Sequence, residues 1–286
     1  MEYILENEFL KVTVTTWGAQ VKSVIRKEDG VEHMWQGDKS VWGYHAPILF
    51  PFAGRLKDST LIAKGQTYTV PSAHGFARTS EHTFVYQNKD TLVLQLTDSP
   101  ETLAVWPYKF RLMSAFTIEG DVLHHTLTVE NRDSSEMPFG IGYHPGFAIP
   151  FDDQHTYEDY ELRFDKLESP ICLVTGAGGL ITGETYCLGT NLNTIPISTQ
   201  LFANDSHCMT ALQSDTLGLY EKDTGRGVVC SIKNFPYCLL WSKPVSRNSS
   251  ASSPGTACPA GQMEAMHGIR SLRQPFCSRR RAGPPL

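Results

Sequence analysis

The sequence contains no run of eighteen apolar residues, which argues against a membrane-spanning helix. Its first nine residues hold three glutamates and no basic residue, whereas a secretory leader begins with a basic segment followed by an apolar core. The 286 residues carry 25 basic and 30 acidic side chains, so no surplus of positive charge exists to attract nucleic acid. We therefore expect a cytoplasmic protein that binds neither membranes nor nucleic acids.

Cysteine is absent from the first 171 residues. The seven cysteines begin at Cys172, and no two of them form a C-x-x-C pair. An odd number without paired spacing favours reduced thiols that act as small apolar side chains over a disulfide framework. Only Cys208, which follows His207, has a neighbour able to activate a thiol nucleophile.

The sequence also lacks the pattern of a metal or cofactor site. His124 and His125 are adjacent in an expected strand, so their side chains point to opposite faces and cannot bind one ion together. The glycine-rich residues 175–179 lack the full dinucleotide-binding fingerprint and a following helix. We predict that the protein needs neither a metal ion nor an organic cofactor.

Helical periodicity is scarce, and the chain instead alternates apolar and polar residues with a period of two. The clearest examples are residues 10–15, 91–96, 110–118 and 122–129. The last two flank a short turn that contains Gly120, which is typical of a hairpin. Only residues 99–105 favour a helical turn, and no repeat of 20 to 50 residues is present. The pattern predicts an all-β fold, a large antiparallel β-sandwich.

Four segments interrupt this alternation with glycine, proline, histidine and arginine, and loops of this kind often carry function. They are residues 42–55, 74–78, 139–147 and 235–242. The first ends in Gly54-Arg55, and the second places His74 and Arg78 where they can converge on a small polar ligand. The third surrounds His144 with glycines that let the backbone approach a ligand. Each segment also has a purely structural interpretation: a surface arginine, a core histidine, a glycine-rich turn and a buried aromatic strand end.

Taken in this order, the four segments resemble the aldose 1-epimerase (galactose mutarotase-like) family in its compact bacterial form. The resemblance covers residues 1–244 and includes the motifs Glu6-Asn7-Glu8-Phe9-Leu10 and Trp35-Gln36-Gly37. It implies one large β-sandwich with a shallow sugar cleft on a concave face. It also implies a reaction, the interconversion of α and β anomers of an aldose without a metal or cofactor.

The resemblance assigns the acid–base chemistry to particular side chains. In the family a carboxylate removes the proton of the anomeric hydroxyl while a histidine protonates the ring oxygen, and the opened ring recloses to either anomer. Each partner in such catalysis is worth roughly 10²–10⁴-fold in rate. Carried over by motif, His144 would be the acid, and His74 would hydrogen-bond the sugar near the reacting centre.

The resemblance also implies sugar-binding residues. Arg55 and Arg78 would hold hydroxyl groups, or the phosphate of a sugar phosphate, because a guanidinium grips oxygens in pairs. Asp205 would accept a hydrogen bond from a hydroxyl, and Trp241 would lie under the sugar unless it belongs to the core. Relatives often carry a basic residue where this sequence has Tyr44, which argues against a sugar phosphate.

The catalytic base of the family is missing from this sequence. In relatives a strand reading approximately V-C-I-E-P-W-x-G follows the Trp-Ser-Lys-Pro segment, and its glutamate is the base. Here residues 245–286 hold six Arg, seven Ser, five Pro and one acidic residue, whereas residues 1–244 hold 19 basic and 29 acidic residues. Codons for residues 248–259 can be chosen that read E-F-V-C-I-E-P-W-H-G-L-P in a neighbouring frame. We hypothesise a one-nucleotide frameshift just after Pro244; a natural disordered tail is the alternative.

These observations predict a sandwich domain over residues 1–244 and a non-family tail over residues 245–286, with the last strands missing or disordered. The sheet edge near residues 228–241 would then be uncovered. The expected function is that of an aldose 1-epimerase crippled by loss of its base, with an aldohexose or its phosphate as the small-molecule partner. The alternatives are a non-catalytic carbohydrate-binding module, a hexose-6-phosphate 1-epimerase and a purely structural sandwich.

Overall fold

The hairpin expected around residues 119–121 is present. In the computed structural model, which describes residues 1–176, 179–204, 206–242, 255–265 and 270–279, β9 (Phe110–Glu119) pairs antiparallel with β10 (Val122–Asn131). Burial alternates along both strands because successive side chains point to opposite faces. His125 is therefore buried against Phe116, with ring centroids 4.1 Å apart, whereas His124 points to the other face.

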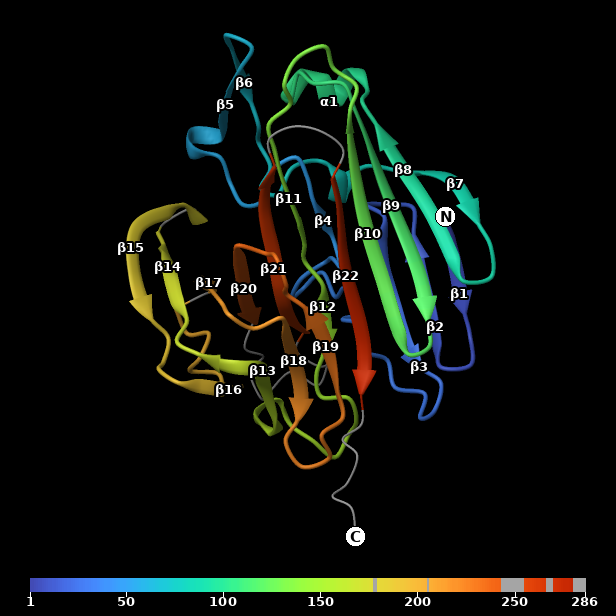
Figure 1. The fold of residues 1–286 in the computed structure, drawn as a ribbon, viewed down its shortest axis with the longest axis vertical. Helices are drawn as coiled ribbons and strands as arrows, with labels where there is room; N and C mark the ends of the chain where they lie inside the picture. The colour runs from blue at the N-terminus through green and yellow to red at the C-terminus, as the bar shows by residue number, and fades with distance from the viewer. Residues whose placement is uncertain (177–178, 205, 243–254, 266–269, 280–286) are drawn as a thin grey trace.

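The fold is an antiparallel β-sandwich, as the alternation predicts, and two large sheets carry most of its strands (Figure 1). The nine-stranded sheet has the order β16 (Leu192–Pro196), β13 (Tyr160–Glu168), β18 (Thr216–Glu221), β19 (Gly227–Ser231), β22 (Arg270–Arg279), β10, β9, β8 (Thr91–Thr97) and β7 (Thr83–Gln87).

The eight-stranded sheet supplies most of the strands around the site described below. Its order is β15 (Ile181–Cys187), β14 (Ile171–Thr175), β17 (His207–Thr210), β20 (Tyr237–Ser242), β21 (Gly255–Ala265), β11 (Phe139–Tyr143) and β4 (Ile48–Leu49), and β12 (Gly146–Ala148) also pairs with β21. Among the described residues, the strand pairs of this sheet are antiparallel.

Small elements complete the described part of the chain. They are a sheet of β1 (Glu2–Glu6), β2 (Leu10–Thr15) and β3 (Gln20–Arg26), a hairpin of β5 (Thr60–Ala63) and β6 (Gln66–Thr69), the 3-10 turns η1 (Lys57–Ser59), η2 (Ala77–Thr79) and η3 (Tyr157–Asp159), and the helix α1 (Pro100–Val105). Helix α1 lies where a helical turn is predicted, capped by Ser99 through a capping box with Thr102. Among the described residues, no helix is long and apolar enough to cross a membrane.

An aromatic cluster between the sheets anchors the segment that leads to the site. Phe50 is fully buried, and its ring centroid lies 5.2 Å from that of Phe110 in β9 and 5.7 Å from that of Phe139 in β11. Trp106, just after α1, packs edge-on at 5.4 Å. Burial of side chains of this size contributes about 1.5–3 kcal/mol each. The cluster therefore fixes the backbone five residues before Arg55.

The expectation of an uncovered sheet edge at residues 228–241 is wrong. Strand β19 pairs with β22 as well as β18, and β20 pairs with β21 as well as β17 (Figure 1). A ladder is built from backbone N–H and C=O groups, which do not require an alternating side-chain pattern. Residues 243–254, 266–269 and 280–286 lie outside the described residues, and the domain boundary at Pro244 stays a prediction.

Candidate active site

A cavity of about 500 Å³ opens on one face of the eight-stranded sheet. Leu173 of β14, Cys208 of β17 and Leu239 of β20 stand opposite one another in the strand register. Because opposed residues of an antiparallel pair share a face, the three side chains form one row along the cavity wall. The remaining lining residues are Trp42, Leu49, Ala53, Gly54, Arg55, His74, His144, Thr175, Gly179, Leu180, Ile181, Ser206, Tyr237 and Trp241.

His74 is held on this cavity by an unusual backbone. It has φ 65°, and the following Gly75 has φ 68°. A Cβ at Gly75 would lie 2.1 Å from the carbonyl oxygen of Phe50, so only glycine fits this approach. The backbone N–H of His74 donates to the Gly54 carbonyl at 2.7 Å. The two loops that carry His74 and Arg55 are thereby joined.

A second hydrogen bond fixes the tautomer of His74. The backbone N–H of Gly54 donates to Nδ1 of His74 at 2.9 Å, so Nδ1 is an acceptor and the neutral ring carries its proton on Nε2. Burial, together with the nearby His144, Arg78 and Arg55, lowers the pKa of His74 to about 3. At neutral pH the residue is an uncharged Nε2–H donor at the cavity wall.

His144 lies in the turn between β11 and β12. Its backbone N–H donates to the Pro47 carbonyl at 3.1 Å. Its ring stacks on Trp42, with centroids 4.9 Å apart and an interplanar angle of 27°, and meets His74 edge-on at 5.8 Å. Burial lowers the pKa of His144 to about 4, and the charge of Arg78 acts in the same direction. The two histidines thus converge from chain positions seventy residues apart.

The two arginines occupy different places. Arg55 is exposed and lines the cavity. Arg78 is half-buried and is not among the lining residues; its guanidinium lies over the ring of Tyr44, 4.8 Å from the centroid. Burial lowers the pKa of Arg78, with Arg55 adding to the effect. Neither arginine forms an ion pair with a residue of 1–176, 179–204 or 206–242.

Four of the six residues singled out from the sequence share this cavity: His144, His74, Arg55 and Trp241. Arg78 lies beside it on Tyr44, and Asp205 lies outside the described residues. Trp42 and Tyr237 also line the cavity and were missed as ligand contacts, although both belong to segments that break the alternation. Among residues 1–176, 179–204 and 206–242, no aspartate or glutamate lines the cavity.

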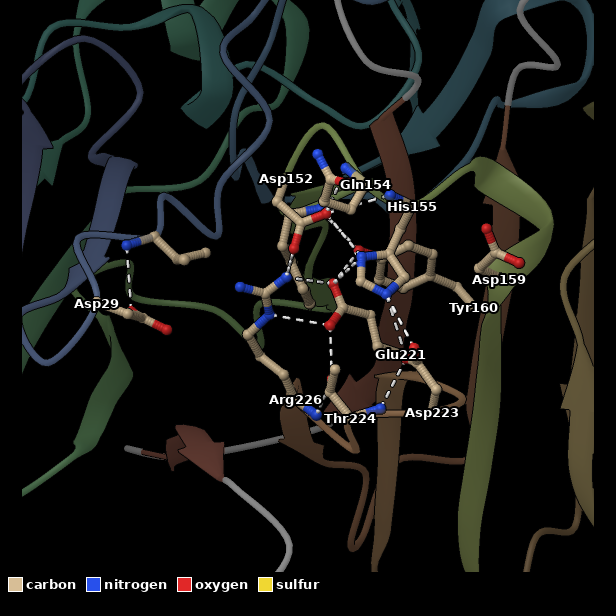
Figure 2. A network of polar contacts seen from close by, with 12 residues as sticks. Asp29, Asp152, Gln154, His155, Asp159, Tyr160, Glu221, Asp223, Thr224 and Arg226 are labelled. Atoms are coloured by element: carbon tan, nitrogen blue, oxygen red, sulfur yellow. Dashed lines mark hydrogen bonds and ion pairs between the residues drawn. The ribbon is translucent and has the colours of Figure 1, made fainter.

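A separate polar network lies where β13 begins and β18 ends (Figure 2). One ligand atom each of Asp152, His155 and Glu221 lies within 4.8 Å of the others, as metal ligands often do. The guanidinium of Arg226 donates to Glu221 at 3.0 Å and 2.5 Å and also to Asp152. The cationic side chain of Arg226 therefore neutralises these carboxylates, and we interpret the network as structural.

His155 is the titratable centre of this network. Its Nδ1 lies 2.6 Å from Asp152, and its Nε2 lies 3.2 Å from Asp223 (Figure 2). The hydrogen bond to Asp152 raises the pKa of His155, and Asp223 and Glu221 add to this effect. Sequence patterns did not indicate this network, because its members come from loops and from the end of β18 without a shared spacing.

Comparison with known proteins places these features in context. The family model for aldose 1-epimerases matches residues 1–192. The plasmid and chromosomal LacX proteins of Lactococcus lactis subsp. lactis are each 31% identical over 247 residues, which are 83% of this chain and 82% of the relative.

Solved structures share the whole fold. A galactose mutarotase related enzyme from Lactobacillus acidophilus superposes with a TM-score of 0.88 at 25% identity, covering 98% of this chain and 97% of the other. A galactose mutarotase-like protein from Lactobacillus casei gives 0.86 at 23% identity, covering 98% and 100%.

Proposed function

The chain belongs to the aldose 1-epimerase family, and from that premise we propose that its 500 Å³ cavity binds an aldose for anomer interconversion by general acid–base ring opening. The observation that carries the proposal is convergence. His74, His144, Arg55 and Trp241, chosen from separate stretches of sequence, line one cavity. Aromatic walls and a few polar groups are typical of sugar and small-molecule sites.

The two histidines would have different tasks. His74, with Nε2–H as donor, would hold a sugar oxygen near the anomeric carbon. His144 would transfer a proton to the ring oxygen as the C1–O5 bond breaks. A base would take the proton of the anomeric hydroxyl, and rotation about C1–C2 followed by closure would give the other anomer. General acid and general base act together in this scheme.

We propose that this chain has lost most of its activity, because its sequence lacks the V-C-I-E-P-W-x-G segment whose glutamate is the base in relatives. The loss acts twice. Without a base the anomeric proton stays in place, and without a nearby carboxylate the depressed pKa of His144 is not brought back towards its ordinary value. We attribute the loss to a frameshift just after Pro244; sequencing the gene across this point decides it, because codons incompatible with the alternative reading would exclude the frameshift.

Sugar binding and anomer exchange are measured separately. Freshly dissolved α-D-glucose or α-D-galactose is followed by polarimetry or by NMR exchange spectroscopy, and binding is followed by tryptophan fluorescence, since Trp42 and Trp241 line the cavity. Saturable binding with exchange near the buffer rate is the expected result for this chain. His144→Asn serves as the matched control. No binding of any aldose would refute the sugar site and favour a purely structural sandwich.

A non-catalytic carbohydrate-binding module is the second candidate, and the missing carboxylate favours it. This role differs from a crippled enzyme in one measurable way. Restoring the family glutamate would give exchange in a crippled enzyme, because the rest of its machinery is in place. In a dedicated binding module the same change would leave exchange at the buffer rate.

The arginines favour an anionic substrate within the same reaction class. Arg55 and Arg78 have no ion-pair partner among residues 1–176, 179–204 and 206–242. Tyr44 contacts the guanidinium of Arg78 by a cation–π interaction, which leaves the positive charge of Arg78 in place. A hexose 6-phosphate would supply the missing negative charge. Tighter binding of glucose 6-phosphate than of glucose, weakened by salt, is the outcome that supports this substrate class.

The compartment is part of the proposal. Five described cysteines, Cys172, Cys187, Cys208, Cys230 and Cys238, are free thiols. Free thiols are typical of a reducing compartment such as the cytoplasm. Fractionation of cells with an antibody against the chain tests this assignment.

A further inference from the structure

Trp42 packs face to face on the histidine assigned as the acid. The indole and imidazole centroids are 4.9 Å apart and their planes differ by 27°. Trp42 lies in the loop between β3 and β4, whereas His144 lies between β11 and β12. The stacking therefore joins two segments about one hundred residues apart.

The indole is itself held in place. The backbone N–H of Trp42 donates to the Asp38 carbonyl at 2.7 Å, and its carbonyl accepts from Nε1 of Trp35 at 2.7 Å. A Cβ at Gly146 would lie 2.7 Å from Cζ3 of Trp42, so the ring also presses against the turn that carries His144. The backbone and the ring of Trp42 are thus both restrained by their neighbours.

His144 has few other restraints. Its Nδ1 is buried and makes no hydrogen bond to another described residue. Its edge contact with His74, at 5.8 Å, is the other ring contact that involves it. Among the described residues, the stacking on Trp42 is therefore the main contact that sets the plane of the imidazole.

The charges around His144 oppose its protonation. The nearby titratable and charged groups are His74, Arg78 and Arg55, with Tyr44 under Arg78 and with Cys208 and Tyr237 across the cavity. None of these groups is a carboxylate. The indole face is the electron-rich surface in contact with the ring, and such a face attracts a cation.

We propose that Trp42 is the positioning residue of the acid: its indole face sets the plane of the His144 ring towards the cavity and stabilises that ring in its protonated form. This inference rests on the proposed function, in which His144 carries a proton to the sugar.

The test measures the protonated fraction of His144 by the ¹³Cε1 shift, on the full chain, in the parent, Trp42→Phe and Trp42→Leu. Phenylalanine keeps an aromatic face, whereas leucine keeps an apolar cover without one. At pH 4.5 a group of pKa about 4 is about one quarter protonated. We expect the pKa of His144 to fall by about 0.4 to 1.5 units in the leucine variant and to stay near the parent value in the phenylalanine variant.

The matched control is Trp241→Leu. Trp241 lies in the same cavity, with its ring centroid 6.4 Å from that of Trp42, whereas the ring contacts of His144 are with Trp42 and His74. We expect the pKa of His144 in this variant to stay within about 0.3 units of the parent, below the range of a cation–π contact. A fall equal to that of Trp42→Leu would overturn the specific role of Trp42.

A second measurement tests the same role of Trp42 if the Trp42→Leu variant does not fold. Tryptophan is replaced biosynthetically by fluorinated tryptophan, which withdraws electrons from the ring with little change of shape. The protonated fraction of His144 should fall as fluorine is added in the parent and stay constant in Trp42→Phe. An unchanged fraction in both would overturn the inference.

The inference and the proposed function fail in different ways. A Trp42-dependent pKa without anomer exchange in a chain that carries the family glutamate would refute the proposed function. Exchange in that chain with a Trp42-independent pKa would refute the role of Trp42 alone.

Discussion

Restoring the family glutamate is the perturbation with the largest expected effect. The gene is edited so that the codons for residues 248–259 are read one base earlier, as E-F-V-C-I-E-P-W-H-G-L-P. The change is expected to return the family carboxylate to a site in which residues 1–176, 179–204 and 206–242 contribute none. It leaves His74, His144, Arg55 and Arg78 untouched.

The structure allows the magnitude to be estimated in two parts. A positioned base is worth roughly 10²–10⁴-fold in rate. With a pKa of about 4, about one His144 in a thousand is protonated at pH 7. A carboxylate within about 4–6 Å raises a neighbouring pKa by roughly 1–3 units, which increases that fraction by about 10- to several-hundred-fold. Because the two groups act together, the combined gain is expected to exceed about 10³-fold.

The assay is the exchange rate of glucose and glucose 6-phosphate anomers, measured by NMR in the present and restored chains at equal concentration. The restored chain with its new glutamate changed to glutamine keeps the strand and lacks the charge. His144→Asn in the restored chain removes the acid. Equal rates in the present and restored chains would refute the assignment of the missing base, as would fast exchange in the glutamine control.

Three further outcomes follow from the geometry. Gly75→Ala should lower the free energy of unfolding, measured by chemical denaturation, by about 3 kcal/mol or more, because the new Cβ would clash with a carbonyl in addition to straining the left-handed backbone. In the control Gly65→Ala, where φ is 74° and no atom lies within 4 Å of the new Cβ, the loss should be only about 1 kcal/mol. Equal losses in the two variants would contradict the packing argument. Because the pKa of His155 is raised in the folded state, the charged ring stabilises the fold fully below the unfolded-state pKa near 6.5, and this contribution is lost as pH rises through the folded-state pKa. The difference in Tm between the parent and His155→Asn should therefore shrink from pH 6 to pH 9, and a constant difference would contradict this. In fluorescence titrations, Arg55→Gln should weaken the binding of glucose 6-phosphate about tenfold and the binding of glucose little, whereas the control Lys57→Gln should change neither. Equal weakening of both sugars by Arg55→Gln would argue against a phosphate contact.

Sequence patterns predicted local structure better than the site. The alternation at residues 110–118 and 122–129 led directly to β9 and β10, because the two-residue period of a strand is a local property. The capped turn at Ser99 was equally local. In contrast, the meeting of His74 with His144 depends on how the sheets fold back, and it was expected only from the family resemblance.

Other features lay beyond pattern reasoning for physical reasons. In the sequence Trp42 is one aromatic residue among several, and its contact with His144 is visible only in the tertiary structure. Arg226 forms an ion pair with Asp152, more than seventy residues away in the sequence, and no spacing pattern predicts this contact. The pairing of β19 and β20 with later strands was missed because side-chain alternation was taken as a requirement for a backbone ladder.

The reciprocal hydrogen bonds between Gly54 and His74 constrain how this site can change. Each loop closes the other, through the Gly54 carbonyl and amide on one side and the His74 amide and ring nitrogen on the other. A specificity loop grafted from a relative onto one segment alone would arrive without its counterpart. Engineering of sugar preference in this scaffold therefore has to exchange residues 54–55 and 74–78 together, because each loop is hydrogen-bonded to the other.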